Sequence, residues 1–164
     1  MSLIQPYLNY CNIIWGSADK TIIEPLFILQ KKAIRIVNRV HYLEHTRPLF
    51  ETMKILTLHQ IHDLNCLAFI YKCLHSNQYL DFKNEMTRNS DYHTYNTRNN
   101  SDFRLPCRDL KNICVSFFYK GINLWNPLNN NLTIYKVNLQ FKSNLLSFKK
   151  RIKHKILTDA IYLG

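Results

Sequence analysis

Histidine and cysteine side chains on one helical segment are the first residues in this chain whose types could support metal chemistry. His62, Cys66 and Cys73 follow one another at intervals of four and seven residues, which places them on nearly one face of an α-helix. A helix rises about 1.5 Å per residue, so His62 and Cys73 would be roughly 16 Å apart, too far to share a zinc ion. His62 and Cys66 alone are too few ligands, and we interpret the cysteines as buried thiols. The sequence predicts no metal site and no cofactor.

Nucleophilic and acid–base chemistry lack a supporting arrangement as well. Cys107 or Cys114 is a conceivable nucleophile with His93 as its base. Asp91 or Asp102 would orient that histidine, yet no local sequence signature joins these residues. The acidic residues form no D-x-D or Y-x-D-D motif, so no two-metal polymerase or nuclease site is expected within the chain. No catalytic residue is therefore predicted.

Positive charge is the strongest chemical signal in the sequence. The chain has 164 residues, and 22 Lys and Arg against 11 Asp and Glu give it a net charge of +11. Such an excess favours polyanionic partners, with nucleic acid before an acidic membrane surface. The charge is also concentrated in particular segments, and we therefore expect a nucleic-acid partner, either a duplex or a single strand of RNA or DNA.

The first basic segment lies on a helix predicted over residues 21–40. Thr21 and Glu24 fit a T-x-x-E capping box at its start. An apolar stripe at helical spacing is predicted to be packed, and it consists of Leu26, Leu29, Ala33, Ile36, Val37 and Val40. Four basic residues lie off this stripe and form what we call the 31–39 basic face: Lys31, Lys32, Arg35 and Arg39. We expect these four to be the main nucleic-acid contacts.

Two further segments combine basic and aromatic residues. Residues 84–102 are rich in Asn, Ser, Thr and Asp and are predicted to be a loop, and Arg98 and Arg104 in and after it alternate with Tyr92, Tyr95 and Phe103. Arginine with aromatic residues is a composition that grips a phosphate backbone and stacks on unpaired bases. A helix predicted from about 139 to 160 adds Lys149, Lys150 and Arg151 as second-rank contacts.

The remaining elements point to a mainly α fold with a small irregular β part. We expect a helix over residues 2–15, a short helix from Thr46 to about Lys54, and a helix from 57 to 75 opened by a Thr57–Gln60 capping box. The last of these is apolar over a wide arc and should be buried on more than one side. Residues 113–119 suit either a strand or a buried turn of helix, and Asn129–Asn131 suit a loop.

The cysteines and the N-terminal stretch bear on the cellular compartment. Five cysteines without a C-x-x-C pair indicate reduced thiols in the cytosol or nucleus. No basic residue precedes Lys20, and polar residues interrupt the apolar run there, so no secretory signal is predicted. The chain also lacks the stretch of about 20 apolar residues that a transmembrane helix needs. We expect a nuclear or cytoplasmic protein that is neither secreted nor membrane-bound.

Seven short blocks of the sequence form a recognisable series. They are PYLNYCNIIWG at 6–16, LQKKAIRI at 29–36, HT-x-PLF at 45–50, YNTRN at 95–99, FRLP at 103–106, G-x-x-LWN-x-L at 121–128 and SFKK-x-IK at 147–153. The series resembles the region that follows the catalytic core in non-LTR (LINE-type, jockey- and CR1-like) retrotransposon reverse transcriptases. The blocks occur in order and span nearly the whole chain.

The resemblance implies a role and an organisation. Residues 1–75 would be a thumb-like helical bundle that holds a primer–template duplex, residues 76–138 an Asn-rich loop with short strands, and residues 139–164 a basic C-terminal helix. In this family the magnesium-binding polymerase acids and the endonuclease precede the region, so the isolated chain is not expected to polymerise DNA. The upstream polymerase core would be its missing partner, and Met1 would not be the original start.

Another class of function remains open from the residues alone. The basic faces could meet acidic protein surfaces in a helical protein-interaction domain, or serve a domesticated nucleic-acid-binding domain with no polymerase role. Competition by unrelated duplex DNA would separate the first of these from nucleic-acid binding.

Overall fold

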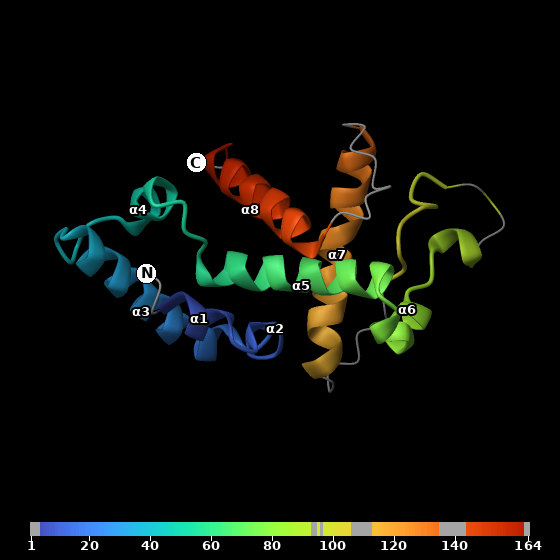
Figure 1. Cartoon of the computed structure of the whole chain (residues 1–164), viewed down its shortest axis with the longest axis horizontal. Helices are drawn as coiled ribbons and strands as arrows, with labels where there is room; N and C mark the ends of the chain where they lie inside the picture. The colour runs from blue at the N-terminus through green and yellow to red at the C-terminus, as the bar shows by residue number, and fades with distance from the viewer. Residues whose placement is uncertain (1–3, 93–94, 96, 106–112, 135–143, 163–164) are drawn as a thin grey trace. The chain divides into compact units, whose positions relative to one another are not determined.

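The fold of the described residues is mainly helical. The computed structural model describes residues 4–92, 95, 97–105, 113–134 and 144–162 (Figure 1). Its longer elements are α1 (Ile4–Asn9), α2 (Asn12–Trp15), α3 (Lys20–Asn38), α4 (Thr46–Thr52), α5 (Leu58–His75), α6 (Leu80–Glu85), α7 (Ile113–Ile134) and α8 (Leu145–Tyr162). Two 3-10 turns, η1 (Asn77–Tyr79) and η2 (Asn89–Asp91), flank α6. The predicted mainly α class is confirmed, but this part of the chain contains no strand, so the expected β part is wrong for the residues described.

The chain divides into two compact units. Unit 1 comprises residues 1–65 and 149–164, and unit 2 comprises residues 66–148. The division falls inside α5 and inside α8, so each of these helices contributes residues to both units. The three-part organisation at residues 75 and 138 that the sequence suggested stays a prediction.

The N-terminal segment of unit 1 is two short helices and not the single helix predicted over 2–15. The break lies at Cys11, whose φ of 47° and ψ of 21° are left-handed. A non-glycine residue in that conformation cannot continue a right-handed helix. The indole Nε1 of Trp15 donates to the Tyr10 carbonyl at 2.6 Å and ties α2 back across the break.

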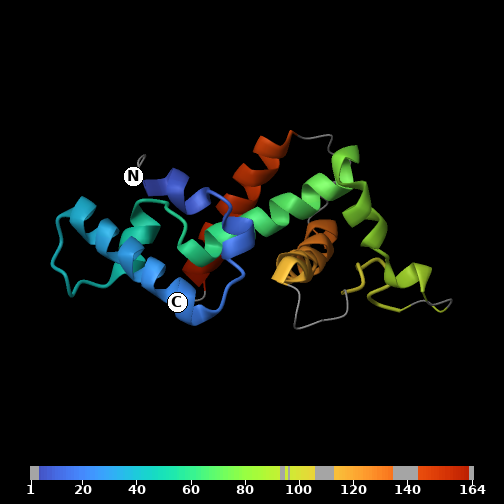
Figure 2. The ribbon, with the colours of Figure 1, turned by 90° about the horizontal axis from the view of Figure 1, so that it is seen from below.

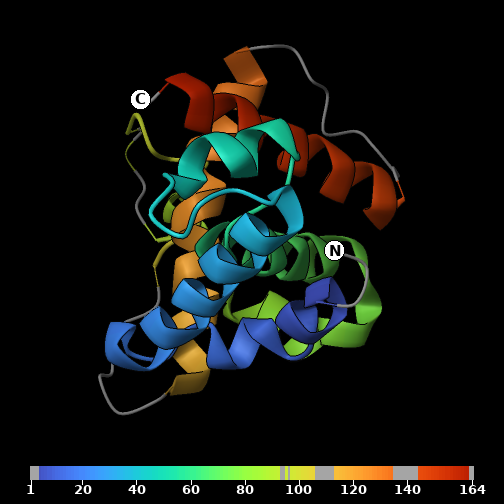
Figure 3. The same cartoon turned by 90° about the vertical axis from the view of Figure 1, so that its left-hand side faces the viewer.

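Helix α3 buries a different face from the one predicted. Its fully buried side chains are Ile23, Gln30 and Ile34, whereas Leu29 and Ile36 of the predicted stripe are 58% and 75% exposed. At 100° per residue the two stripes lie roughly 90° apart on the helix, and both recur at helical spacing. The neighbours select between them, because Phe27 packs on Phe50 of α4 with ring centroids 6.5 Å apart. Figure 3 shows α3 crossing in front with α4 above it.

The start of α3 also differs from the prediction. Asp19 caps the helix, and its Oδ1 accepts from the Lys20 amide at 2.8 Å. The helix therefore begins before Thr21, and the T-x-x-E box is not its cap. An aspartate accepts amide protons at a helix N-terminus more strongly than a threonine does, which explains the shift by local chemistry.

The start of α5 confirms the prediction. The Thr57 amide donates to Gln60 Oε1 at 2.9 Å, and the Gln60 amide donates to Thr57 Oγ1 at 3.3 Å, which is a reciprocal capping box. Gln30 of α3 completes this helix start from outside. Its Nε2 donates to the Leu56 carbonyl at 3.0 Å, and its Oε1 accepts from the Leu58 amide at 2.9 Å. Gln30 is only 3% exposed, and both the NH2 group and the oxygen of its side-chain amide have hydrogen-bond partners.

The core of unit 2 forms where α7 crosses α5. The two helices cross at a large angle in Figure 1, and α7 is seen nearly end-on in Figure 2. Gly121 lets them approach, because a Cβ there would lie 2.8 Å from Ile70 Cγ1 and 3.3 Å from the Cys66 carbonyl. Residues 113–119 are the first turns of this helix, so the helical alternative holds, and Asn129–Asn131 continue it and are not the predicted loop.

Candidate nucleic-acid interface

The 31–39 basic face is formed by a single long helix. Helix α3 runs for 19 residues, and the four Cα positions fall within an arc of roughly 100° when each residue turns by 100°. That arc is centred roughly 130° from the stripe that holds Ile23, Gln30 and Ile34, so burying one face leaves the other toward solvent. Lys31, Lys32 and Arg35 therefore share one side of α3, and Arg39 adds a fourth positive charge at the C-cap of the same helix.

The four side chains differ in how far they are engaged inside the protein. Lys31 Nζ lies 4.0 Å from Glu24 Oε1 and 3.9 Å from the centroid of the Phe27 ring. Arg35 Nε donates to the Glu44 carbonyl at 2.9 Å, which leaves its terminal nitrogens for other acceptors. Lys32 and Arg39 are exposed. Contacts of this kind at a surface are worth about 1 kcal/mol or less, so a phosphate can compete with them.

Arg39 has a special backbone conformation at the end of the helix. Its φ of 53° and ψ of 37° are left-handed, and its amide donates to the carbonyls of the last turn. Glycine is the residue usually found at such a position because an arginine Cβ there is strained. Replacing Arg39 by glycine should therefore stabilise the fold while removing a positive charge from the basic face. Such a variant can distinguish a loss of binding from a loss of folding.

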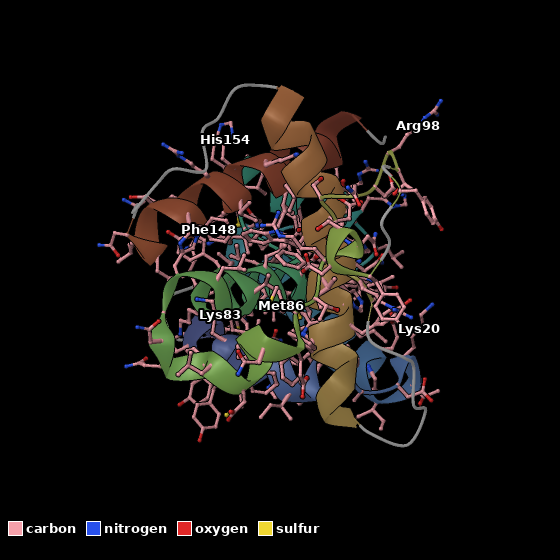
Figure 4. All side chains as sticks on the ribbon, turned by 90° about the vertical axis from the view of Figure 1, so that its right-hand side faces the viewer. Lys20, Lys83, Met86, Arg98, Phe148 and His154 are labelled. Carbon is pink, nitrogen blue, oxygen red and sulfur yellow. The ribbon has the colours of Figure 1, made fainter. Side chains whose placement is uncertain are left out.

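The predicted basic contacts of α8 lie on the part of the helix that is not buried. Phe148 and Ile152 are buried one turn apart, while Lys150 and Arg151 are exposed and Lys149 is half-buried. Consecutive residues turn by 100°, so Lys149, Lys150 and Arg151 fan around the helix and do not form one line. His154, which the sequence reasoning did not include, is exposed (labelled in Figure 4). It follows Lys150 by four residues, so the two lie on the same side of the helix.

The loop arginines belong to unit 2 and have an aromatic partner. The guanidinium Cζ of Arg104 lies 3.9 Å from the centroid of the Tyr92 ring, and Arg88 Cζ lies 5.3 Å from that of Phe103. Arg98 is exposed and points outward from the loop (Figure 4). The pairing of Arg104 with Tyr92 is consistent with the predicted alternation of arginine and aromatic residues, and it adds a contact that spacing alone did not specify.

The thiols and the imidazole on α5 are core groups. Cys66 and Cys73 are both 0% exposed, and the interpretation of these cysteines as buried thiols is confirmed. The His62 ring is 2% exposed, with Nδ1 3.1 Å from the Asn12 carbonyl and Nε2 3.3 Å from Ser17 Oγ. Among the described residues, no group of three His, Cys, Asp or Glu side chains could hold a metal ion. Cys107 and His93 of the conceivable nucleophile–base pair lie outside the described residues.

Apolar side chains remain exposed on α3 beside the basic face. The most exposed of them are Ile22, Leu29 and Ile36, at 66%, 58% and 75%. Isolated exposed apolar residues are common, but a run along one helix is typical of a surface that meets another protein. None of the helices in the described ranges has the length and apolar content needed to cross a membrane.

Comparison with known proteins does not place the chain in a family. No protein-family model, curated protein or solved structure matches it. Its function must therefore be inferred from the chemistry of the basic and aromatic surfaces described above.

Proposed function

We propose that this chain binds nucleic acid through the 31–39 basic face, as the non-catalytic thumb and post-thumb region of a non-LTR retrotransposon reverse transcriptase. The observation that carries the proposal is that Lys31, Lys32 and Arg35 share one arc of α3 away from its buried stripe. Arg39 follows as the C-cap residue, and all four side chains are exposed or partly exposed. A helix of this kind can lie along a primer–template backbone with its charges toward the phosphates. The ordered blocks that resemble the reverse transcriptases support the same role.

The proposal assigns the chemistry of polymerisation to another part of the parent polymerase. The magnesium-binding acids would belong to the upstream core, which would be the partner of this chain together with the nucleic acid. The chain itself would add affinity for the duplex and no catalytic group. Its place of action would be the nucleus or the cytoplasm.

The salt dependence of binding gives the proposal a magnitude. Each phosphate neutralised on duplex DNA contributes a slope of about −0.9 to a plot of log affinity against log salt concentration. Four contacts from the 31–39 basic face would together contribute a slope of roughly −3.6. Affinity for duplexes of unrelated sequence should be similar, because phosphate contacts carry no base information.

A charge-neutralising variant tests the proposal directly. The variant replaces Lys31, Lys32, Arg35 and Arg39 by glutamine, and its Kd for a primer–template duplex is measured over a range of salt. We expect weaker binding to every duplex sequence and a salt slope reduced by about 3–4. Binding as tight as that of the parent would show that the face is not the interface.

A single substitution excludes unfolding as the reason for lost binding. Arg39→Gly relieves the left-handed strain at φ 53° and should raise the free energy of unfolding by about 0.5–1 kcal/mol. The same variant should bind duplex more weakly, with a slope reduced by about 1. Lys54→Gly is the matched control, because Lys54 has φ 51° but lies after α4, outside the basic face. It should gain similar stability and bind like the parent.

A protein-interaction domain is the second candidate, and the exposed apolar run on α3 favours it. Ile22, Leu29 and Ile36 would then form the centre of a contact whose basic rim meets an acidic partner. Under this alternative, unrelated duplex DNA would not compete for the partner. Strong competition by duplex would instead favour the nucleic-acid role.

A further inference from the structure

We infer that Tyr92 and Arg104 form a stacking site for unpaired bases of single-stranded nucleic acid. They lie in a loop whose described residues are 87–92, 95 and 97–105. This inference rests on the proposed nucleic-acid function and gives it a second substrate form, distinct from the duplex held by α3. The site lies wholly within unit 2.

The base of the loop is held closed by its own backbone. An isolated antiparallel bridge joins Arg88 and Phe103, and the Arg104 amide donates to the Thr87 carbonyl at 2.8 Å. The Asn89 and Ser90 amides donate to carbonyls of the returning segment, at 3.0 Å each. The two ends of the loop are therefore fixed side by side, and this brings residues 92 and 104 together.

A side chain from α7 holds the same point of the loop. Asn126 Nδ2 donates to the Phe103 carbonyl at 2.8 Å, and Asn126 Oδ1 accepts from the Phe103 amide at 3.0 Å. Both backbone groups of Phe103 are thus satisfied by one amide, and the Phe103 ring itself is 7% exposed. Arg104 is the next residue after Phe103, so the position of the Arg104 backbone is fixed by the core of unit 2.

The Tyr92 ring and the Arg104 guanidinium are in contact, and both residues are exposed. The 3.9 Å between Cζ and the ring centroid is a van der Waals contact, and Tyr92 nevertheless remains 65% exposed. Tyr95 is 62% exposed in the same loop, and Arg98 points outward (Figure 4). Aromatic rings and guanidinium planes both stack on base faces, and an outward arginine can reach the adjoining phosphate.

The charge of the loop favours an unpaired strand over a duplex. The loop contains three arginines and two aspartates, Asp91 and Asp102, so its net positive charge is small. Charge therefore supplies little of the affinity for nucleic acid, and planar contact must supply most of it. Base faces are hidden inside a duplex and become available only when the strand is unpaired. The shared chemistry of the ligand is therefore a stacked base with its phosphate, from RNA or DNA.

Four ligands and three variants test the inference. The ligands are a fluorescent single strand of about ten nucleotides as RNA, the same as DNA, an abasic strand with equal phosphates, and a duplex. The variants are Tyr92→Leu, Tyr92→Phe and, as the matched control, Tyr7→Leu, because Tyr7 is an 81% exposed tyrosine of α1. Circular dichroism of each variant confirms that it is folded.

The expected pattern is specific to stacking. Tyr92→Leu should weaken single-strand binding by about 5–150-fold, because one base on an aromatic ring is worth about 1–3 kcal/mol. Tyr92→Phe and Tyr7→Leu should bind like the parent. The abasic strand should bind weakly and equally to the parent and to Tyr92→Leu, and duplex affinity should be unchanged throughout. Comparing the two strands identifies whether RNA or DNA is preferred.

The contrary results distinguish this inference from the proposed function. If Tyr92→Leu binds the single strand as tightly as the parent while duplex binding is intact, the stacking site is wrong and the duplex role stands. If the abasic strand binds as tightly as the normal strand, stacking is likewise overturned. If the parent binds none of the four ligands, both the stacking site and the proposed function are wrong.

Discussion

Gly16 lies directly against the imidazole of His62, with the Asn12 carbonyl on the same side, and a Cβ at Gly16 would overlap both. Its φ of −66° and ψ of −12° suit any residue, so the glycine is required for space and not for conformation. The contact holds α2 against α5, because His62 Nδ1 is within hydrogen-bond distance of the same Asn12 carbonyl.

Replacing Gly16 should be costly. Gly16→Ala places a methyl group on a backbone carbonyl and a buried ring, and we expect it to lower the free energy of unfolding by about 2–3 kcal/mol. Urea denaturation monitored by circular dichroism measures the change. Gly121→Ala is the comparison and should cost less stability than Gly16→Ala. The closest atom to its new Cβ belongs to the Ile70 side chain, which can move, and alanine favours a helix over glycine by about 1 kcal/mol. Equal losses at the two glycines would contradict this view of Gly16.

Gln30 should be more important than its place on a helix suggests. Gln30→Leu leaves the Leu56 carbonyl and the Leu58 amide unpaired in the core, and it should cost about 2–4 kcal/mol in unfolding free energy. Gln78→Leu, at an exposed glutamine of η1, should change stability by about 0.5 kcal/mol or less. Thermal and urea unfolding of the two variants provide the test, and similar stabilities would refute the bridging role.

The pH dependence of Gln30→Glu should reveal which atom matters. A protonated carboxyl can donate to the Leu56 carbonyl as the amide does, but a carboxylate cannot and is buried. The folded pKa of the new glutamate should therefore lie above its unfolded value of about 4.3. The stability of the variant relative to the parent should be highest below the unfolded pKa of about 4.3. It should decline as the pH rises through the folded pKa. A deficit independent of pH would argue against a donor role at this position.

The thiol at Cys73 should be unreactive in the folded protein. Burial raises the pKa of Cys73 to about 11, and the thiolate is the reactive form. In a variant that keeps Cys11 and Cys73 as its only cysteines, a thiol reagent at pH 8 should modify the exposed Cys11 first and Cys73 only on unfolding. Because the folded pKa is raised, this group should also lower stability as the pH rises from about 9 toward 11. Rapid labelling of Cys73 in the native protein would disprove its burial.

His75 should titrate below the ordinary range of a histidine. Partial burial lowers its pKa first, and the nearby charge of Lys83 lowers it further. Lys83→Gln should move the pKa of His75 back upward, whereas Lys20→Gln, in unit 1, should leave it unchanged. The lowered pKa means that neutral His75 contributes stability above the unfolded pKa of about 6.5, which is lost as the pH falls through the folded pKa. Proton NMR titration of the imidazole measures these pKa values. An unchanged His75 pKa in Lys83→Gln would show that the Lys83 charge does not lower it.

The sequence by itself determined the features that depend on local chemistry. The Thr57–Gln60 capping box joins residues three apart, so it was readable before any fold was known. The 31–39 basic face depends only on helical spacing and charge, and its position on α3 followed for the same reason. The burial of Cys66 and Cys73 followed from the wide apolar arc of their helix.

Only the tertiary structure decided the features that depend on distant neighbours. Helix α3 has two apolar stripes, and the packing of Phe27 on Phe50 and of Gln30 on the start of α5 determined which one is buried. The β-branched and aromatic segment after residue 112 became helical, because tertiary packing overrides weak local propensity. Asn126 and Phe103 are 23 residues apart, and no local rule brings such a pair into hydrogen-bond contact. Interactions between residues three or four positions apart could thus be predicted from the sequence, whereas contacts between remote segments required the folded chain.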